Sequence, residues 1–142
     1  LRAYLEKFSR QSGVATRLAA PENDSFELPP RVEIQLVRVI QEALANVRKH
    51  ARAANAWVEL KRHDGGVRVA VGDDGQGFDP SSAERQTDGG YGIATMRERL
   101  AGIGGHLAIE SAPSRGTVVV ATVPLASQRG AKDGEGQSSP GG

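Results

Sequence analysis

The stretch VEIQLVRVIQEALANVRKHA, Val32 to Ala51, and the segment VELKRHDGGVRVAV that follows it, Val58 to Val71, decide the fold class. In the first, apolar residues recur every three or four positions, which is the period of an amphipathic helix. In the second, apolar and polar residues alternate on both sides of His63 to Gly66, where Asp64 and Gly65 are typical of a hairpin turn. A long helix followed by a β-hairpin predicts a sheet with a helix packed on it.

The flanking segments extend this pattern in both directions. Leu1 to Arg10 has the apolar spacing of a short amphipathic helix, and Val14 to Ala19 alternates like a strand. Downstream, Ile93 to Ile103 restores a helical period, and His106 to Ser111 and Thr117 to Val123 indicate a closing pair of strands. We therefore predict an α+β fold, a two-layer sandwich in which helices cover one face of a mixed sheet.

Composition excludes several classes of protein. The 142 residues are a length typical of one domain, and the absence of cysteine excludes disulfide scaffolds and Cys-ligated metal sites. Lys and Arg number 18 against 17 Asp and Glu, and this net charge of +1 argues against a protein that coats nucleic acid or anionic membranes. The longest charge-free stretch, Gly116 to Gln128, is too short to cross a membrane, and no signal peptide is visible. We expect a soluble domain with no direct nucleic-acid partner.

Glycine is abundant, with 18 residues, whereas aromatic residues make up only 4%. Five of the glycines lie between Gly130 and Gly142, in a segment with no large apolar residue. Such a segment cannot bury enough surface to order itself, so we expect residues 127–142 to form a disordered tail. The chain begins at Leu1 and not at Met, so we also expect a piece of a longer protein.

Three clusters of residues point to chemistry. They are Glu42 to His50 on the long helix, Asp73 to Phe78 after a strand, and Gly89 to Gly92 before a helix. None of them is the phosphate loop G-x-x-x-x-G-K-[ST] or the dinucleotide fingerprint G-x-G-x-x-G, and the protein-kinase signatures are missing.

Together, these clusters resemble a known family. The runs QEALANVRKHA (Gln41 to Ala51), VGDDGQGFDP (Val71 to Pro80) and GGYGIATMRERLAGIGGHLAIESAPSRGTVVVATVP (Gly89 to Pro124) resemble the N, G1 and G2 boxes of a histidine-kinase ATP-binding domain. The M-R-E-R-L element and the final G-T resemble sensor kinases that pair with response regulators of the LuxR/NarL type. The resemblance covers roughly Gly13 to Pro124, in order and with normal spacing.

The resemblance implies the Bergerat fold, with a mostly antiparallel sheet, as in gyrase, its heat-shock chaperone relative and the mismatch-repair ATPase. It implies a connecting helix from a dimerisation domain at residues 1–12 and an ATP-binding catalytic domain at 13–126, with ATP and Mg²⁺ as cofactors. The implied partners are the phosphoacceptor domain of the same protein and a response regulator. The implied location is cytoplasmic, whether or not the parent protein is anchored in a membrane, and the fragment alone is expected to be monomeric.

The N-box residues carry implied roles. The family's Asn, here Asn46, ligates Mg²⁺, and an amide oxygen suits a hard cation that also bridges phosphates. Lys49 lies one turn further and can approach the phosphates as a point charge. Glu42 matches a general base of the hydrolytic relatives, whereas in a kinase it would assist the acceptor histidine. The alternative for all three is an ordinary solvated helix face.

Asp73 is the residue on which the prediction depends most. In the family, the matching carboxylate accepts a hydrogen bond from the adenine amino group, so ATP should bind better than GTP. Gly75 and Gly77 would let the backbone approach the base and sugar without a Cβ in the way. The alternative is that Asp73, Asp74 and Gly75 form an ordinary turn.

The third box is expected to face the phosphates. Gly90 and Gly92 precede a helix whose N–H groups and positive dipole end can bind an anion, although the same glycines also suit a flexible loop with a helix cap. Pro80 to Gly89 matches the family's mobile lid, in which Arg85 either touches the terminal phosphate or is solvated. Thr117 matches a position near adenine, but a strand Thr is also simply a good β former.

Several other residues have less specific roles. Ile93 and Ser114 replace the commoner Leu and Gly of the family pattern, and both changes affect supporting positions. We expect Trp57, Tyr4 and Tyr91 to be packing residues and His63 to be a turn residue.

The phosphoacceptor histidine is not recognisable in this chain. His50, His63 and His106 each lack the acidic and basic context of an acceptor motif, so self-labelling is not expected. The sequence predicts the catalytic half of a sensor histidine kinase. Two alternatives stay open: a serine kinase of the anti-sigma type with the same fold, and a module that senses nucleotide without transferring phosphate.

Overall fold

The computed structural model describes residues 1–21, 28–79 and 91–125 of the chain. The elements follow the predicted order: α1 (Arg2–Ser12), β1 (Ala15–Ala19), α2 (Pro30–Asn46), a π-helical turn η1 (Val47–Ala51), β2 (Asn55–His63), β3 (Gly66–Asp73), α4 (Ile93–Ala101), β4 (His106–Ser111) and β5 (Thr117–Pro124). The strand predicted from Val14 begins one residue later, at Ala15.

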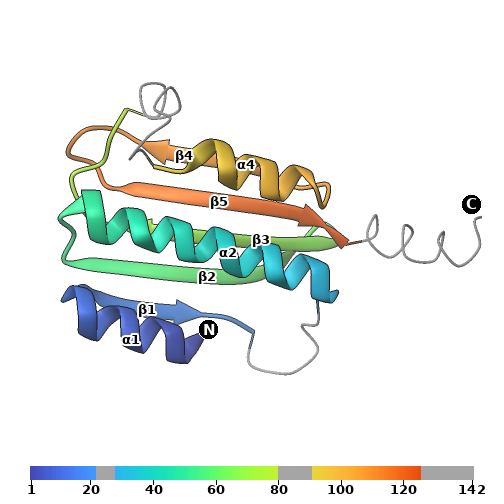
Figure 1. Ribbon diagram of the computed structural model, residues 1–142, viewed down its shortest axis with the longest axis horizontal. Helices are drawn as coiled ribbons and strands as arrows, with labels where there is room; N and C mark the ends of the chain where they lie inside the picture. The colour runs from blue at the N-terminus through green and yellow to red at the C-terminus, as the bar shows by residue number, and fades with distance from the viewer. Residues whose placement is uncertain (22–27, 80–90, 126–142) are drawn as a thin grey trace, which may run out of the picture.

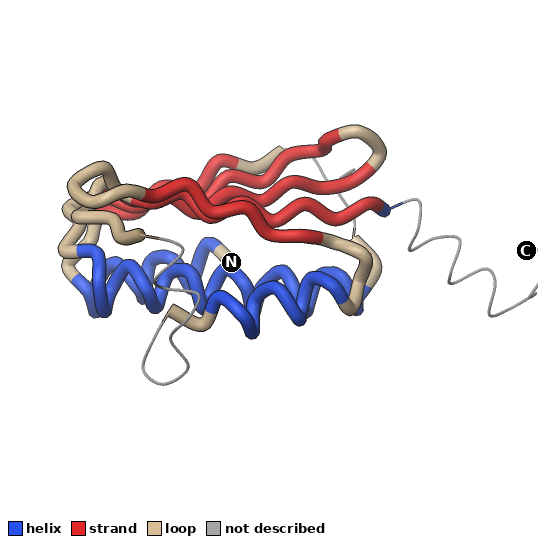
Figure 2. Tube along the Cα trace, turned by 90° about the horizontal axis from the view of Figure 1, so that it is seen from above, coloured by secondary structure: helices blue, strands red, loops and turns tan. Residues whose placement is uncertain are grey.

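The strands form one five-stranded sheet in the order β1-β2-β3-β5-β4. β1 pairs with β2 in parallel, and every other pair is antiparallel. The helices lie on a single face of this sheet (Figures 1 and 2). The predicted two-layer α+β sandwich, with a mixed and mostly antiparallel sheet, is confirmed.

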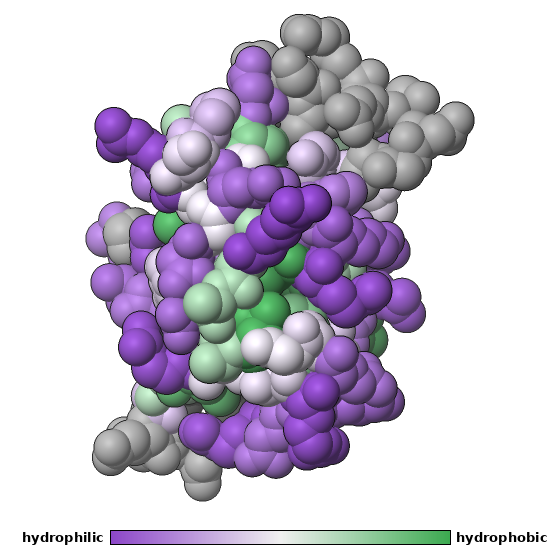
Figure 3. Space-filling model, turned by 90° about the vertical axis from the view of Figure 1, so that its left-hand side faces the viewer, coloured by the Kyte–Doolittle hydropathy of each residue, from purple (hydrophilic) through white to green (hydrophobic). Residues whose placement is uncertain are grey.

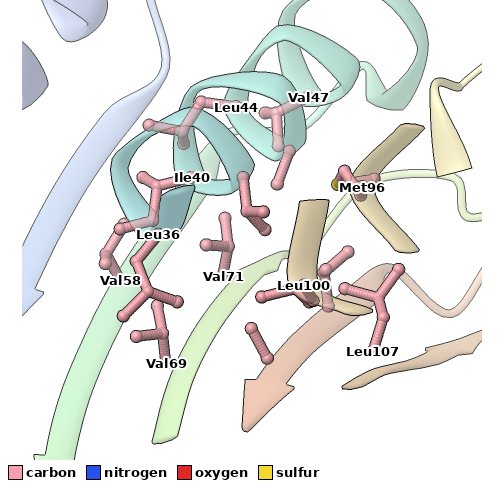
Figure 4. Close-up of a cluster of buried hydrophobic side chains, with 14 of the residues drawn as sticks. Leu36, Ile40, Leu44, Val47, Val58, Val69, Val71, Met96, Leu100 and Leu107 are labelled. Carbon is pink, nitrogen blue, oxygen red and sulfur yellow. The ribbon is translucent and has the colours of Figure 1, made fainter. Parts of the chain in front are cut away.

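The core lies between α2, α4 and the sheet (Figure 4). Pro30 lies in the first turn of α2, where its missing N–H costs no helical hydrogen bond. The predicted apolar stripe of α2 is buried and includes Leu36, Ile40 and Leu44, each at most 2% exposed. Alternate residues of the strands meet this stripe because successive strand side chains point to opposite faces. The buried face thus follows directly from the two periodicities in the sequence.

The β2–β3 hairpin has the predicted turn. Asp64 and Gly65 both have positive φ, 50° and 75°, as a two-residue turn of type I′ requires. Gly suits this conformation and Asp tolerates it better than most residues do.

The long helix differs from the prediction at its end. The pattern predicts one helix from Val32 to Ala51, but the α-helix ends at Asn46 and the chain continues as the wider turn η1. After it, Arg52 adopts a left-handed conformation with φ 53°. Gln76 satisfies two carbonyl groups of η1: its backbone N donates to Ala51 O at 2.7 Å and its Nε2 to His50 O at 2.6 Å. The local pattern could not anticipate this change, because these bonds come from a distant loop.

α1 packs against the same core, with Leu5 and Phe8 buried and Tyr4 partly buried against it. Its role as a connecting helix from another domain stays a prediction. The tail predicted at 127–142 lies outside the described residues. Among the described residues, no helix is both long and apolar enough to span a membrane.

Candidate functional site

A pocket opens at the end of the sheet where β3 ends and β5 begins, between the sheet, η1 and the start of α4. This end of the sheet lies on the left in Figure 1. In Figure 3 apolar surface lies in the middle of this end of the molecule and hydrophilic residues surround it. The hollow holds about 440 Å³ of space between atoms, its open mouth included. It is lined by Ala43, Asn46, Val47, His50, Ala51, Val71, Asp73, Gly77, Phe78, Tyr91, Ile93, Met96, Ile109, Thr117 and Val119.

Asp73 and Thr117 are the buried polar residues of this pocket. They are register partners on β3 and β5. In the described part of the chain they are also the two polar residues that are buried, at 6% and 8% exposure. The alternation that turns valines inward along both strands therefore turns one carboxylate and one hydroxyl inward at the strand ends. This pairing brings together two of the residues that the sequence predicted.

Burial raises the pKa of Asp73. The hydrogen bond that its Oδ1 accepts from Gly75 N, at 2.7 Å, acts in the opposite direction, and the negative charge of Asp74 raises the pKa again. Desolvation disfavours the charged form of a carboxyl group, so this carboxylate is held at an energetic cost. Oδ2 is left to accept a hydrogen bond from a ligand.

Asp74, the second acidic residue of the motif, has a different role. It is exposed, and its Oδ1 accepts hydrogen bonds from Ala54 N and Asn55 N, both at 2.9 Å. Its Oδ2 accepts a third from Asn55 Nδ2 at 2.8 Å. These bonds to Asn55 and Ala54 lower the pKa of Asp74, the side-chain bond most. Asp74 therefore ties the motif loop to the beginning of β2.

Gly75 and Gly77 are required for contacts within the protein. A Cβ on Gly75 would collide with the carbonyl oxygen of Ala51, at the end of η1. A Cβ on Gly77, which has φ +69°, would collide with the carbonyl oxygen of Ala112. The expected approach to a base and sugar stays a prediction, but the structure supplies a nearer reason for both glycines: they let the motif loop touch η1 on one side and the β4–β5 turn on the other.

Asn46 faces the pocket from the last turn of α2. Its Nδ2 donates to Tyr91 O at 2.7 Å, across 45 positions of sequence. This bond fixes the orientation of the amide and leaves Oδ1 available as an acceptor. The segment that leads into α4 is thereby tied to the N-box helix.

Glu42 lies beside Gly92 at the start of α4. A Cβ on Gly92, which has φ +66°, would collide with the carboxylate of Glu42. Glu42 does not line the pocket and instead borders a second, more open groove with Arg38, Gln41, Thr95, Met96 and Arg99. The two helices meet closely at this point because Gly92 has no side chain.

Of the predicted site residues that the structure describes, Glu42, Lys49, Gly75 and Gly92 are not among those that line the pocket. Lys49 is exposed on η1 and is not among the lining residues. Gly90 lies outside the described residues, as do the lid from Pro80 to Gly89 and Arg85 within it. The roles proposed for these residues stay predictions.

The pocket is also lined by three ring side chains, His50, Phe78 and Tyr91, which were not among the predicted site residues. The rings of Phe78 and Tyr91 stack with centroids 4.3 Å apart and planes at 19°. The ring of His50 lies 4.3 Å from that of Tyr91, at 45°. Tyr91 was expected only to pack, but it both packs against the core and borders the pocket. Their positions inside the three glycine-rich or polar motifs were the signal that could have identified them.

His50 also carries an unsatisfied polar atom. Its Nε2 is buried and has no hydrogen-bond partner within the described structure. A buried nitrogen without a partner is costly, and a ligand that enters the pocket can relieve this cost. The residues present fit a flat aromatic ligand with polar edges. They offer rings on which the ligand can stack, the unpaired Nε2 of His50, and oxygen atoms of Asp73 and Thr117 that can accept hydrogen bonds.

Among the described residues, no group of three or more His, Cys, Asp or Glu side chains could enclose a metal ion. Mg²⁺, however, usually keeps several waters and takes only one or two protein ligands together with phosphate oxygens. The amide Oδ1 of Asn46, in the wall of the pocket, fits that kind of site.

Comparison with known proteins identifies the family. The model of the histidine kinase-, DNA gyrase B- and HSP90-like ATPases matches residues 31–127. The chain is 31% identical over 129 residues to the signal transduction histidine-protein kinase/phosphatase DegS of Brevibacillus brevis, a match that covers 90% of this chain and 32% of DegS. It is 33% identical over 104 residues to the sensor protein VraS of Staphylococcus aureus, covering 73% of this chain and 29% of VraS.

Solved structures show the same fold. The blue-light activated histidine kinase of Erythrobacter litoralis superimposes with a TM-score of 0.72 at 23% identity, over 90% of this chain and 42% of that one. A mycobacterial sensor histidine kinase, MprB, gives 0.64 at 20% identity, over 87% of this chain and 90% of that one.

The chain therefore belongs to the family of histidine kinase-, DNA gyrase B- and HSP90-like ATPases. Its ATPase-type domain is similar to the domains of sensor histidine kinases, the class that the three sequence boxes resemble. The chain spans about a third or less of the length of the curated relatives named above.

Proposed function

We propose that this domain binds Mg-ATP in the pocket at the ends of β3 and β5 and presents the γ-phosphate to a histidine on a separate dimerisation domain. The observation that carries the proposal is the pairing of Asp73 with Thr117, the two buried polar residues of the described chain, in a pocket lined, apart from Asn46, by glycine, apolar and ring side chains. Because ATP is the phosphate donor, the domain would work in the cytoplasm.

The base would enter between the rings and the sheet. Asp73 Oδ2 would accept a hydrogen bond from the adenine amino group, since an ionised carboxylate can only accept. The rings of His50, Phe78 and Tyr91 offer surfaces on which a purine can stack. A ligand donor would also satisfy the buried Nε2 of His50 when that nitrogen is the unprotonated one.

The phosphates would lie toward Asn46 and the start of α4. When bound, Mg²⁺ neutralises phosphate charge and orients the oxygens for transfer. Asn46 would hold it through Oδ1, and its bond to Tyr91 O keeps that oxygen in place. Lys49 would approach the phosphates as a mobile charge, and the N-terminus of α4 at Gly92 would face them with free N–H groups.

Glu42 would act at the acceptor side. It lies against Gly92 and outside the pocket, so it would meet the imidazole of an incoming histidine before it met the base. A carboxylate there can accept the proton that the histidine releases as its nitrogen attacks. Most of the catalysis would come from positioning and charge neutralisation, as is general for phosphoryl transfer.

Titration calorimetry with ATP, with and without Mg²⁺, tests binding. We expect affinity in the micromolar range or weaker, since ordering a loop on binding consumes part of the interaction energy. The variant Asn46→Ala should lose most of the Mg²⁺ dependence, whereas Glu33→Ala, on the same helix but far from the pocket, should keep it. Absence of ATP binding by the wild-type chain, or unchanged Mg²⁺ dependence in Asn46→Ala, would contradict the proposal.

Transfer is tested by incubating the chain with labelled ATP and the dimerisation domain of its own parent protein. Label on a histidine of that domain supports the proposal. Label on a serine of a protein partner would indicate a kinase of the anti-sigma type, and binding without any label would indicate a sensing module. Alone, the chain should hydrolyse ATP slowly at most and should not label itself.

We further propose that the phosphohistidine donates to a response regulator with a LuxR/NarL-type output domain. The M-R-E-R-L element at the α4 positions Met96 to Leu100 supports this pairing. Phosphotransfer from the labelled dimerisation domain to receiver domains of that class, compared with receivers of other classes, tests it. Equal or faster transfer to another class would contradict it.

A further inference from the structure

Ser111, the last residue of β4, joins three parts of the pocket wall. Its Oγ accepts a hydrogen bond from Phe78 N at 2.9 Å and donates one to Gly116 O at 3.0 Å. It also lies 2.7 Å from Thr117 Oγ1, directly across the β4–β5 register. One small half-buried side chain therefore connects the loop after β3, the β4–β5 turn and the hydroxyl group that lines the pocket.

The protons in this network can be assigned by counting. A serine hydroxyl has one proton and two lone pairs. The carbonyl of Gly116 can only accept, so the proton of Ser111 points to it. The N–H of Phe78 can only donate, so it occupies one lone pair. The contact between Ser111 and Thr117 must then use the remaining lone pair, and Thr117 must be the donor.

This assignment determines what Thr117 offers to a ligand. Its proton points toward Ser111 and away from the pocket, so only lone pairs face inward. Its strand partner Asp73 is a carboxylate with one oxygen already bonded to Gly75 N, and it too can only accept. These two side chains at the ends of β3 and β5 therefore present acceptors to a ligand and no donor.

We propose that Ser111 is a positioning residue for nucleotide specificity, because it holds the proton of Thr117 away from the base. Without Ser111, the hydroxyl of Thr117 could rotate and donate to the oxygen of a 6-oxo purine. With Ser111 in place, the 6-oxygen of such a base meets only acceptors on Asp73 and Thr117. Asp73 thus selects bases that carry the 6-amino group. When a base has an oxygen there instead, Ser111 prevents Thr117 from donating a hydrogen bond to that oxygen. This inference rests on the proposed nucleotide binding.

The experiment compares ATP with inosine triphosphate, which carries an oxygen at the 6-position and lacks the 2-amino group of guanine. The dissociation constants of both nucleotides are measured for wild type, Ser111→Ala, Ser111→Thr and Glu110→Ala. Glu110 is the exposed neighbour on the same strand and serves as the matched control.

In Ser111→Ala we expect the preference for ATP over inosine triphosphate to fall about fivefold, the effect of one gained hydrogen bond. Ser111→Thr keeps the hydroxyl and should restore the preference, and Glu110→Ala should leave it unchanged. If Ser111 had a purely structural role, its replacement would weaken the binding of both nucleotides equally. An unchanged ratio in a folded Ser111→Ala protein would therefore overturn the inference while leaving the proposed function intact.

A second measurement needs no variant. In proton NMR of the wild-type chain, the hydroxyl proton of Thr117 should exchange slowly with water and show a nuclear Overhauser effect to the β-protons of Ser111. Exchange as fast as that of the exposed Thr95 hydroxyl would overturn the assignment. If the wild type binds neither nucleotide, the proposed function fails, and this inference fails with it.

Discussion

Asp73 and Thr117 face each other across β3 and β5, and both side chains are buried on the face of the sheet that the helices cover. Along β3, Val67, Val69 and Val71 occupy the preceding positions of that face. A charged group at the end of an apolar row lowers the stability of the fold. Proteins keep such destabilising residues mainly at functional sites. This relationship leads to the first prediction.

Replacing Asp73 by Asn should make the ligand-free chain more stable at neutral pH and should weaken ATP binding. Burial raises the pKa of Asp73, so between the unfolded and folded pKa values the folded chain holds more protons than the unfolded one. Stability therefore falls as pH rises through that window, and at neutral pH the ionised group is a net cost. Asn is neutral and can still accept the bond from Gly75 N.

Urea unfolding of both proteins as a function of pH measures this effect. The advantage of Asp73→Asn over wild type should shrink as the pH falls through the raised pKa toward the unfolded value. ATP affinity should fall at least about tenfold, as expected when a buried hydrogen-bonding pair is mismatched. A variant that is less stable at pH 7, or that binds ATP as well as wild type does, would contradict the argument.

Asp74 should behave in the opposite way. Hydrogen bonds to Asn55 and Ala54 lower its pKa, so its contribution is present above the unfolded pKa and is lost as pH falls through the folded value. Asp74→Ala should be less stable than wild type at neutral pH, and the difference should disappear in acid. Chemical denaturation at several pH values checks this, and a difference that persists at low pH would show that the loss has another cause.

Ser114→Gly should stabilise the chain by up to about 1 kcal/mol. The left-handed conformation costs a non-glycine residue roughly this much free energy, because its Cβ crowds the backbone. Ser114 has φ 68° in the β4–β5 turn, at the position where the family pattern commonly has Gly. The midpoint of urea unfolding measures the change. The neighbouring Arg115 is not among the residues with positive φ, so Arg115→Gly should give no gain and serves as the control.

Gly75→Ala should destabilise the chain by more than about 2 kcal/mol or prevent folding, since overpacking against fixed backbone costs typically about 1–3 kcal/mol. The added Cβ would collide with the carbonyl oxygen of Ala51. Gly102→Ala is the matched control: its Cβ would meet nothing closer than 3.6 Å, and φ is −65°. That change should stabilise the folded chain by about 0.4–1 kcal/mol, because alanine lowers the conformational entropy of the unfolded chain. Thermal unfolding of the two variants gives the comparison, and similar effects at both sites would contradict the assigned role of Gly75.

The sequence by itself determined the order of the elements, the apolar faces of α2 and of the strands, and the hairpin at Asp64 and Gly65. These features depend on periods of 3.6 and 2 residues and on local turn preferences, all of which can be seen in one short window. The same alternation placed Asp73 on the buried face. Asp73 and Asn46, two of the predicted site residues that line the pocket, were recognisable from their motifs alone.

Only the tertiary structure decided what the pocket is made of. The π-helical end of α2 depends on Gln76, the orientation of Asn46 depends on Tyr91 O, and the hydroxyl of Thr117 contacts that of Ser111. The partners of His50 and Asn46 are separated from them by 26 and 45 positions. Local patterns carry no information about such pairs, because these contacts form only when the packed core brings distant segments to within hydrogen-bonding distance.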